Sequence, residues 1–414
     1  MKPTPLKRVK DFEELGFGMF VHWGLYSQLE QGEWTMHIHK IPKEEYVKLF
    51  DTFTAEDFDA EELVRLAKSA GMKYIVLTTR HHEGFSLYDT KGLNEYDAPH
   101  SPAHRDLVKE FADACRKYDI LPFFYHTTID WWKEEFETDF EGYLEYLRQS
   151  VEVLCKNYGK IGGFWFDGNW WHPNADWKED KLYGIIRKYQ PDAIIVNNTG
   201  MQARGAKGQE ELDSVTFEQG RPTPMDREGM DKYLAAEMCE TINGVWGVGK
   251  VDLRNKSTAQ LIETLCACRK VGANYLLNIG PTGTGAILPI QRYTLEELGK
   301  WTKIYNEAIR TPKPCGMLAT KKDFVLRDGN KLYFFIHDLP TGGDPNVTVN
   351  QGDFEHAARV FGGIKENIKS LKWLDNGEEL KFTQLKQSDM LLFNATFFAY
   401  GIDMVVRVAV AEVE

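Results

Sequence analysis

The sequence predicts a (β/α)8-like barrel followed by a C-terminal antiparallel β-sandwich. Strand-like and helix-like segments alternate about eight times in roughly the first 300 residues, with short connections. The strand-like segments are apolar along their whole length, which is typical of a parallel sheet covered by helices. After the segment TPKP at residues 311–314 this alternation ends, and short strand-like runs separated by turns follow. We therefore expect a catalytic barrel domain at residues 1–312 and a β-sandwich domain at residues 313–414.

The expected barrel strands are short apolar runs that end at a polar residue. The first is FGMFVHW at residues 17–23, and YIVLTT at residues 74–79 is rich in residues that favour strands. Residues 235–241 could form either a helix or a strand. The other expected strands are residues 121–125, 164–166, 193–196, 214–217 and 275–277.

Amphipathic spacing predicts the helices between these strands. Gly71 follows the first of them at a position typical of a C-cap. The sixth helix of the repeat is weak, so we expect an irregular barrel there. A doubly wound open sheet is the alternative, but it predicts a glycine-rich turn after the first strand, and none is found. The expected helices are residues 60–70, 106–118, 140–158, 180–189, 258–271 and 289–308.

The last hundred or so residues have the pattern of an antiparallel sandwich. Short runs at residues 332–336, 347–349 and 404–410 alternate with Asp-Gly, Gly-Gly and Asn-Gly turns. We expect four aromatic residues of this part to lie in its core rather than in a binding site; they are Trp373, Phe397, Phe398 and Tyr400.

Composition and charge disfavour several classes of partner. The formal net charge is -12, which disfavours nucleic acid and anionic membranes. No run approaches the roughly 18 apolar residues of a membrane span. The N-terminal segment lacks the apolar core of a signal peptide, so we expect a cytoplasmic protein unless a leader has been removed. The six cysteines show no C-x-x-C spacing, which indicates free thiols and argues against a zinc site.

Polar side chains stand at or just beyond the ends of the expected strands. In this fold the carboxyl ends of the strands carry the active site. Eight polar residues that converge on one rim therefore predict an active site there. They are His22, His81, His82, His126, Asp167, Asn197, Glu218 and Asn278.

The histidines leave two chemistries open. They could bind a metal, and His37 and His39 have a suggestive spacing, but these two lie in an expected loop. His81 and His82 are adjacent and would point opposite ways on a regular strand, and HHEGF at residues 81–85 is not the HExxH zinc motif. Imidazoles, tryptophans and carboxylates together are better suited to a sugar ring, with two carboxylates for the hydrolysis.

The stretch GGFWFDGNWW at residues 162–171 carries the strongest candidate. Its aromatic run ends abruptly at Asp167. A carboxylate where a buried strand emerges is costly unless something pairs with it or uses it. Asp167 is either a catalytic carboxylate on a sugar-binding floor or a cap for the next turn.

Five stretches form an ordered set: FGMFVHWGLYS (17–27), GMKYIVLTTRHHEGFSLYDT (71–90), RDLVKEF (105–111), GGFWFDG (162–168) and NYLLNIGPTGTG (274–285). In sequence, order and spacing they resemble the α-L-fucosidases of glycoside hydrolase family 29, across nearly the whole chain. The resemblance implies a (β/α)8-like barrel with a C-terminal β-sandwich, retaining hydrolysis of α-L-fucosides, and no cofactor or metal.

The same resemblance implies roles for single residues. Asp167 matches the family nucleophile in a Trp-x-Asp setting, which includes Trp165. Tyr125 and His126 share the end of the third strand, and which of them faces the sugar is open. Arg204 could replace an arginine that many relatives have directly after the fifth strand. The remaining matches, all to sugar-binding residues, are His22, Glu33, Trp34, His81, His82 and Trp246.

Two carboxylates compete for the role of general acid/base. Glu218 follows the expected sixth strand and fits the rim, and DSVTFEQG resembles the family's acid/base segment more closely than AAEMCET does. Glu237, flanked by apolar residues, fits a buried structural role better. We therefore expect a retaining exo-α-L-fucosidase that uses Asp167 and Glu218. The alternatives are a metal-dependent hydrolase on the same barrel and a non-catalytic sugar-binding barrel.

Overall fold

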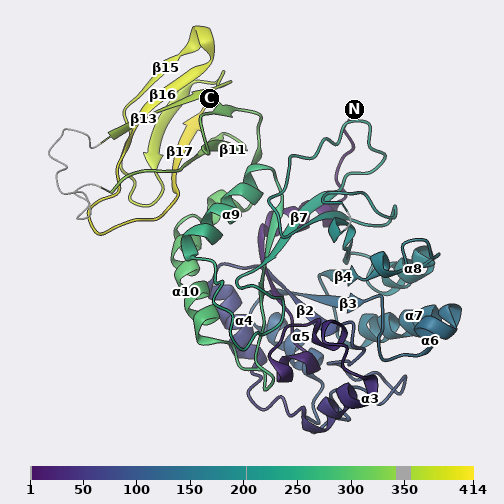
Figure 1. Ribbon diagram of the computed structural model, residues 1–414. Helices are drawn as coiled ribbons and strands as arrows, with labels where there is room; N and C mark the ends of the chain where they lie inside the picture. Colours follow the sequence, from purple (N-terminus) through teal and green to yellow (C-terminus); the bar gives the residue numbers. More distant parts are fainter. Residues whose placement is uncertain (1, 202, 342–355) are drawn as a thin grey trace. The chain divides into compact units, whose positions relative to one another are not determined.

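The computed structural model describes residues 2–201, 203–341 and 356–414 (Figure 1). The run predicted at residues 347–349 lies outside the described residues. The chain divides into two compact units: Met1–Lys256 with Ala273–Glu296, and Ser257–Gly272 with Glu297–Glu414. The boundary predicted at residue 312 stays a prediction. No helix among the described residues is long and apolar enough to cross a membrane.

Eight parallel strands close a barrel in the first unit, in the order in which they occur in the chain. The barrel closes where β1 pairs with β8, with Phe17 opposite Tyr275. This confirms the predicted fold, and residues 235–241 are a strand. The strands are β1 (Phe17–Val21), β2 (Tyr74–Arg80), β3 (Leu121–Thr127), β4 (Gly163–Asp167), β5 (Ile194–Asn197), β6 (Ser214–Glu218), β7 (Ala235–Thr241) and β8 (Asn274–Ile279).

Most connections contain the predicted helices. Asp59, Asp106 and Asp139 each cap a helix by accepting a hydrogen bond from a backbone N–H of its first turn. In the described residues no α-helix joins β5 to β6 or β6 to β7, so the irregularity covers two connections rather than one. The helices are α1 (Lys7–Leu15), α2 (Thr35–Ile38), α3 (Lys43–Tyr46), α4 (Ala60–Ser69), α5 (Leu107–Lys117), α6 (Glu135–Thr138), α7 (Phe140–Asn157), α8 (Glu179–Tyr189), α9 (Thr258–Lys270) and α10 (Pro289–Ile304).

Helix α1 packs against the amino ends of the barrel strands. Its Val9 and Phe12 belong to one buried cluster with Tyr74, Phe123 and Ile194, which lie near the starts of β2, β3 and β5. The aromatic side chains of this cluster fill the interior. The barrel is therefore a packed core, and the space for a ligand is at the carboxyl ends.

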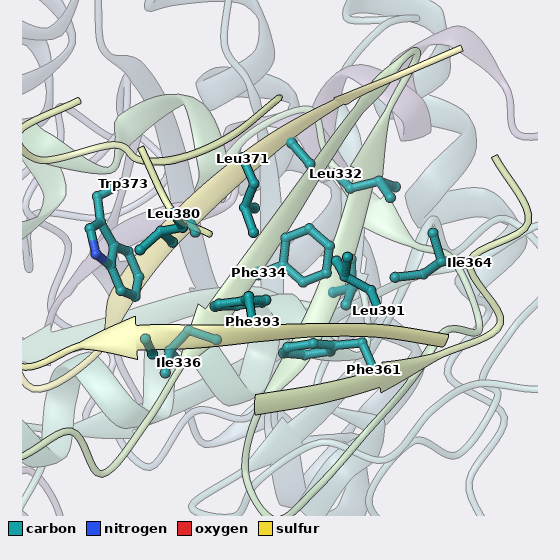
Figure 2. Close-up of a cluster of buried hydrophobic side chains, with 14 of the residues drawn as sticks. Leu332, Phe334, Ile336, Phe361, Ile364, Leu371, Trp373, Leu380, Leu391 and Phe393 are labelled. Carbon is teal, nitrogen blue, oxygen red and sulfur yellow. The ribbon is translucent and has the colours of Figure 1, made fainter. Parts of the chain in front are cut away.

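The second unit contains two antiparallel sheets, in the orders β10-β13-β16-β15 and β14-β17-β12-β11-β9. Figure 2 shows its core, in which Phe334 and Phe361 come from different sheets with ring centroids 4.8 Å apart. The strands are β9 (Lys313–Pro314), β10 (Leu318–Ala319), β11 (Phe324–Asp328), β12 (Lys331–Ile336), β13 (His356–Gly362), β14 (Ile368–Trp373), β15 (Phe382–Leu385), β16 (Met390–Thr396) and β17 (Arg407–Val413).

The predicted sandwich is confirmed, and the four aromatic residues predicted for its core differ in burial; Phe397 is half-buried. Trp373 and Phe398 are buried in the core, as predicted. The prediction was wrong for Tyr400, whose side chain is 68% exposed. Tyr400 follows β16 in an irregular segment, where strand alternation does not direct a side chain inward.

Candidate active site

A pocket opens at the carboxyl ends of the barrel strands. Nine predicted site residues line it: His22, Glu33, Trp34, His81, Tyr125, Trp165, Asp167, Glu218 and Trp246. Four further side chains complete its wall: Phe20, Trp170, Asn198 and Met201. The rings of Tyr125 and Trp165 stack with centroids 5.9 Å apart and form part of an aromatic floor.

Asp167 lies at the end of β4 and is held by several hydrogen-bond donors. Trp170 Nε1 lies 2.8 Å and Asn198 Nδ2 3.1 Å from its Oδ1. Tyr125 Oη donates to Oδ2 at 3.1 Å, and His82 Nε2 lies 3.5 Å from the same oxygen. Burial would raise the pKa of Asp167, but His82, Trp170 and Asn198 outweigh burial and hold the pKa below its usual value. Asp167 is therefore an ionised carboxylate at neutral pH.

Glu218 lies at the end of β6 and shares a hydrogen-bond donor with Asp167. Asn198 Nδ2 is 2.7 Å from Glu218 Oε2 and 3.1 Å from Asp167 Oδ1. The two carboxylate oxygens are therefore no further apart than the sum of these two distances. Burial, followed by the negative charge of Asp167, raises the pKa of Glu218 to about 7. One carboxyl group is thus ionised and its neighbour can carry a proton near neutral pH.

His22 presents a hydrogen-bond acceptor to the pocket. Its Nδ1 lies 2.7 Å from Asn278 Oδ1, and Asn278 Nδ2 donates to the carbonyl of Trp246 at 2.7 Å. Burial lowers the pKa of His22 to about 3, so the ring is neutral. Since Nδ1 must donate to the Asn278 oxygen, Nε2 is left without a proton. That nitrogen can accept a hydrogen bond from a hydroxyl.

His81 and His82 do not point to opposite faces, because they follow β2 instead of lying within it. Their ring centroids are 4.1 Å apart, and the ring of His81 stacks on Tyr125. His82 Nδ1 lies 2.7 Å from Thr127 Oγ1, and its other nitrogen faces Asp167. His81 lines the pocket, and its Nδ1 is 3.5 Å from the buried carboxyl group of Glu83.

The loop that follows β1 contributes a carboxylate and an indole. Glu33 Oε2 accepts a hydrogen bond from the backbone N–H of Gly247 at 2.9 Å, and burial raises the pKa of Glu33. Trp34 stacks on Trp170 with ring centroids 5.6 Å apart. The indole that donates to Asp167 is thereby packed against a second indole of the pocket lining.

Two predicted substrate-binding residues lie elsewhere. Strand alternation turns Tyr125 into the barrel and His126 out of it, where His126 contacts Tyr88. Arg204 is exposed and donates to the backbone carbonyl groups of Glu218 and Gln219 at 2.9 and 3.1 Å. It supports the end of β6 from outside the pocket.

The same alternation separates the two asparagines at the end of β5. Asn197 also points away from the pocket and donates to Tyr183 of α8 at 2.9 Å, whereas Asn198 lines the pocket. Counting in steps of two from the buried Val196 would have selected Asn198 from the sequence. Trp170 and Met201 lie in 3-10 helices of three residues each, which are too short to give a periodic signal.

Glu237 lies inside the barrel, away from the pocket lining. Trp165 Nε1 donates to its Oε1 at 2.9 Å, and the hydroxyl of Tyr74 donates to Oε2. Burial raises the pKa of Glu237 to about 7. This carboxyl group therefore orients the indole of Trp165 at the pocket floor, which agrees with the structural role that the sequence favoured.

We expect Glu237→Ala to lower the free energy of unfolding by about 2–4 kcal/mol, because it leaves two buried donors unpaired and opens a cavity. Glu237→Gln should be much milder, since an amide can still accept from Trp165 and can donate to the hydroxyl of Tyr74. Urea unfolding of the three proteins measures the difference. Equal stability of the alanine and glutamine variants would contradict this role.

The family resemblance assigns His81 to the sugar, and His81 lines the pocket. We therefore expect His81→Ala to weaken the binding of L-fucose about fivefold or more, since one such hydrogen bond is worth about 1 kcal/mol. Isothermal titration calorimetry measures the dissociation constant. His39→Ala is the matched control, because His39 is exposed and does not line the pocket. An unchanged dissociation constant for the His81 variant would remove this residue from the binding site.

A metal-ligand arrangement is absent from the part of the chain that the structure describes: no three or more His, Cys, Asp or Glu side chains are grouped to hold an ion. The Nδ1 atoms of His22 and His82 lie at hydrogen-bond distance from the side chains of Asn278 and Thr127.

Comparisons with known proteins agree on one family. The family model described as α-L-fucosidase matches residues 4–307. Tissue α-L-fucosidase of Bos taurus is 30% identical over 364 residues, which is 80% of this chain and 75% of the relative. The Homo sapiens enzyme is 30% identical over 368 residues, 81% of this chain and 77% of the relative. The structure of α-L-fucosidase isoenzyme 1 from Paenibacillus thiaminolyticus superposes with a TM-score of 0.83, at 30% identity and over 99% of both chains.

Proposed function

The chain belongs to the α-L-fucosidase family of glycoside hydrolases, and we propose that it removes terminal α-L-fucose from oligosaccharides or glycoconjugates with retention of configuration. In this proposal Asp167 is the nucleophile and Glu218 is the general acid/base. The other pocket residues bind the sugar ring and position these two groups.

The observation that carries the proposal is the amide of Asn198 between the two carboxyl groups. Its contacts of 3.1 Å to Asp167 and 2.7 Å to Glu218 limit the separation of those oxygens to less than 6 Å. Retaining glycosidases hold their carboxyl groups about 5–5.5 Å apart, whereas inverting enzymes need roughly 6.5–9.5 Å to admit a water molecule. The separation therefore favours direct attack by a carboxylate.

The electrostatics of the pair suit a double displacement. An Asp167 oxygen attacks the anomeric carbon while Glu218 gives its proton to the departing glycosidic oxygen, which leaves as an alcohol. Glu218, now ionised, takes a proton from water, and the resulting hydroxide equivalent displaces Asp167 from the sugar. Fucose is released, and both carboxyl groups return to their starting states.

The rest of the pocket fits a deoxy sugar. His22 Nε2 and the carboxyl group of Glu33 supply acceptors for hydroxyl groups. Phe20 and Trp246 line the same pocket, and their ring centroids are 5.8 Å apart, so they offer an apolar surface beside these polar groups. An apolar wall of this kind suits the C5 methyl group of fucose.

A panel of 4-nitrophenyl glycosides, tested with and without a chelator, examines this function. We expect cleavage of the α-L-fucoside above all others, unaffected by EDTA, and proton NMR should detect α-L-fucose as the first product. Loss of activity with EDTA would favour the metal-dependent hydrolase. Binding of fucose by folded protein without cleavage of any substrate would favour the non-catalytic sugar-binding barrel.

A cytoplasmic location stays a prediction. All six cysteines are free thiols, and five of them are buried. Free thiols in this number fit a reducing compartment.

A further inference from the structure

A buried carboxyl group lies behind the wall of the pocket and takes no part in the proposed reaction. Glu83 follows His81 and His82 after β2, and its side chain is only 1% exposed. Neither of its carboxyl oxygens has a hydrogen-bond partner among the described residues. A Cβ at Gly24 would lie 2.6 Å from Oε1, so the chain that follows β1 packs against this group. A carboxyl group buried without donors is costly unless a neighbouring group uses it.

The ring of His81 has an unpaired nitrogen that faces this carboxyl group. His81 Nδ1 lies 3.5 Å from Glu83 Oε2, and it is buried without a hydrogen-bond partner in the described part of the chain. Tyr125 stacks on the ring with centroids 5.6 Å apart, and Tyr26 packs edge-on at 5.3 Å. Because these two rings hold the imidazole in place, Nδ1 stays near Glu83. Nε2 is then the nitrogen that His81 presents to the pocket.

The two side chains together hold two protons at neutral pH. Burial raises the pKa of Glu83 to about 8, so the carboxyl group is mostly protonated. Burial lowers the pKa of His81 well below its usual range, and the neighbouring rings of His82 and His22 act in the same direction, so the ring is neutral. A protonated carboxyl group has one O–H to donate, and Nδ1 is an unpaired acceptor that faces it. The proton of the ring itself is then on Nε2.

The other titratable groups around Glu83 leave this arrangement in place. The charge of Asp130 contributes to the raised pKa of Glu83, and Asp130 Oδ1 accepts from two backbone N–H groups of its own. The backbone N–H groups of Glu83 and Leu25 favour the ionised form of Glu83, but neither makes a hydrogen bond of normal geometry with its oxygens. Three tyrosines nearby have pKa values raised by burial and then by the charge of Glu83, so they stay neutral. They are Tyr26, Tyr46 and Tyr96.

We propose that Glu83 is a positioning residue that donates its carboxyl proton to His81 Nδ1, so that His81 presents an N–H donor at Nε2 to a hydroxyl group of L-fucose. The inference rests on the proposed function and adds the placement of protons in its binding site. His22 presents the complementary group, because its Nδ1 donates to Asn278 and its Nε2 can accept. The pocket therefore offers one imidazole donor and one imidazole acceptor to hydroxyl groups, which can do both.

Loss of the carboxyl proton should reverse this contact. Once Glu83 has released its proton to solvent, the proton of the ring moves to Nδ1, where it is donated to the carboxylate, and Nε2 becomes an acceptor. A sugar hydroxyl that accepts from His81 can donate its own proton elsewhere in the pocket. After the reversal it must donate to His81 and lose that second hydrogen bond. The affinity for L-fucose should therefore fall as the pH rises through about 8.

Glu83→Gln separates the effect of the proton from that of side-chain shape. The amide carries N–H donors at every pH, so His81 keeps its proton on Nε2. Isothermal titration calorimetry with L-fucose measures the dissociation constants of both proteins. We expect these constants to agree within about twofold at about pH 6.5. At about pH 9.5 the wild-type constant should be about fivefold the higher or more, which is the usual effect of one hydrogen bond.

Two controls isolate the contact between Glu83 and His81. Glu240→Gln changes another buried glutamate, which accepts a hydrogen bond from Tyr275 and does not line the pocket. Its dissociation constant should follow that of the wild type at every pH. In a His81→Ala background, Glu83→Gln should have no pH-dependent effect on binding, because its partner is missing.

Nitrogen NMR of protein labelled at histidine observes the proton directly. The signals of His81, assigned by their loss in His81→Ala, should show a protonated Nε2 at about pH 6.5. This measurement needs no substitution of Glu83, so it is decisive even where the glutamine variant does not fold. A proton on Nδ1 at that pH, a constant ratio of the wild-type and Glu83→Gln dissociation constants, or the same pH-dependent difference without His81 would overturn the inference. A folded wild-type protein that does not bind L-fucose would instead overturn the proposed function.

Discussion

Asp167→Gly is expected to lower kcat for 4-nitrophenyl α-L-fucoside by at least about three orders of magnitude while the protein stays folded. The carboxylate oxygen that would form the bond to the anomeric carbon is missing, and no other group is in place to form it. Three side chains that donate to Asp167, from Tyr125, Trp170 and Asn198, remain and can be hydrated by water that enters the vacated space.

Sodium azide distinguishes loss of the nucleophile from general damage. The vacated space lies on the face of the sugar opposite the leaving group, so azide should enter there, restore part of the rate and yield β-L-fucosyl azide. Asp176→Gly is the matched control, because Asp176 is an exposed aspartate on the same segment after β4. A near-wild-type rate for the Asp167 variant, or an azide product of α configuration, would exclude Asp167 as nucleophile.

The barrel was predictable from the sequence because its strands are buried on both faces. Continuous apolar runs such as residues 74–79 and 121–125 carry that signal directly. Residues 235–241 were ambiguous, since alanine, glutamate and methionine favour helices. This segment is a strand that pairs with β6 and β8, and single-residue propensity carries no information about such pairing.

The candidate site was predictable where strand ends define it and less so where loops do. Asp167, Glu218 and His22 lie at or just beyond the ends of β4, β6 and β1, so their place on the rim followed from the strand assignment. Arg204 lies in an irregular segment, and its side chain is oriented by the backbone carbonyl groups to which it donates. Sequence periodicity does not predict such contacts.

The hydrogen bonds that Trp170 and Asn198 donate to Asp167 could not be predicted from the sequence. In the sequence, this tryptophan and this asparagine look like ordinary packing residues. Only the structure identifies them as donors to a carboxylate. The sequence therefore predicted the positions of the two candidate catalytic carboxylates, Asp167 and Glu218, but not these two side chains that hydrogen-bond to them.

Glu218→Ala should reduce the hydrolysis of fucosylated oligosaccharides by about 10²–10⁴-fold, the usual contribution of a general acid/base. The loss should be far smaller for the bond-breaking step of aryl fucosides with acidic leaving groups, because a nitrophenolate departs without protonation. Plots of log kcat/KM against leaving-group pKa should therefore be steeper for the variant than for the wild type. Azide should accelerate the second step by attacking the sugar bound to Asp167, which gives α-L-fucosyl azide.

The pH dependence provides an independent measurement. Glu218 acts as an acid only while it is protonated, and burial beside Asp167 raises its pKa to about 7. The wild-type kcat/KM should thus fall as the pH rises through about 7, and Glu218→Ala should lose this alkaline limb. Glu237 also has a pKa raised to about 7, by burial, so Glu237→Gln is the necessary control and should keep the limb. If the limb disappears with Glu237→Gln and persists with Glu218→Ala, the two glutamates exchange roles, and the bridge through Asn198 is then only structural.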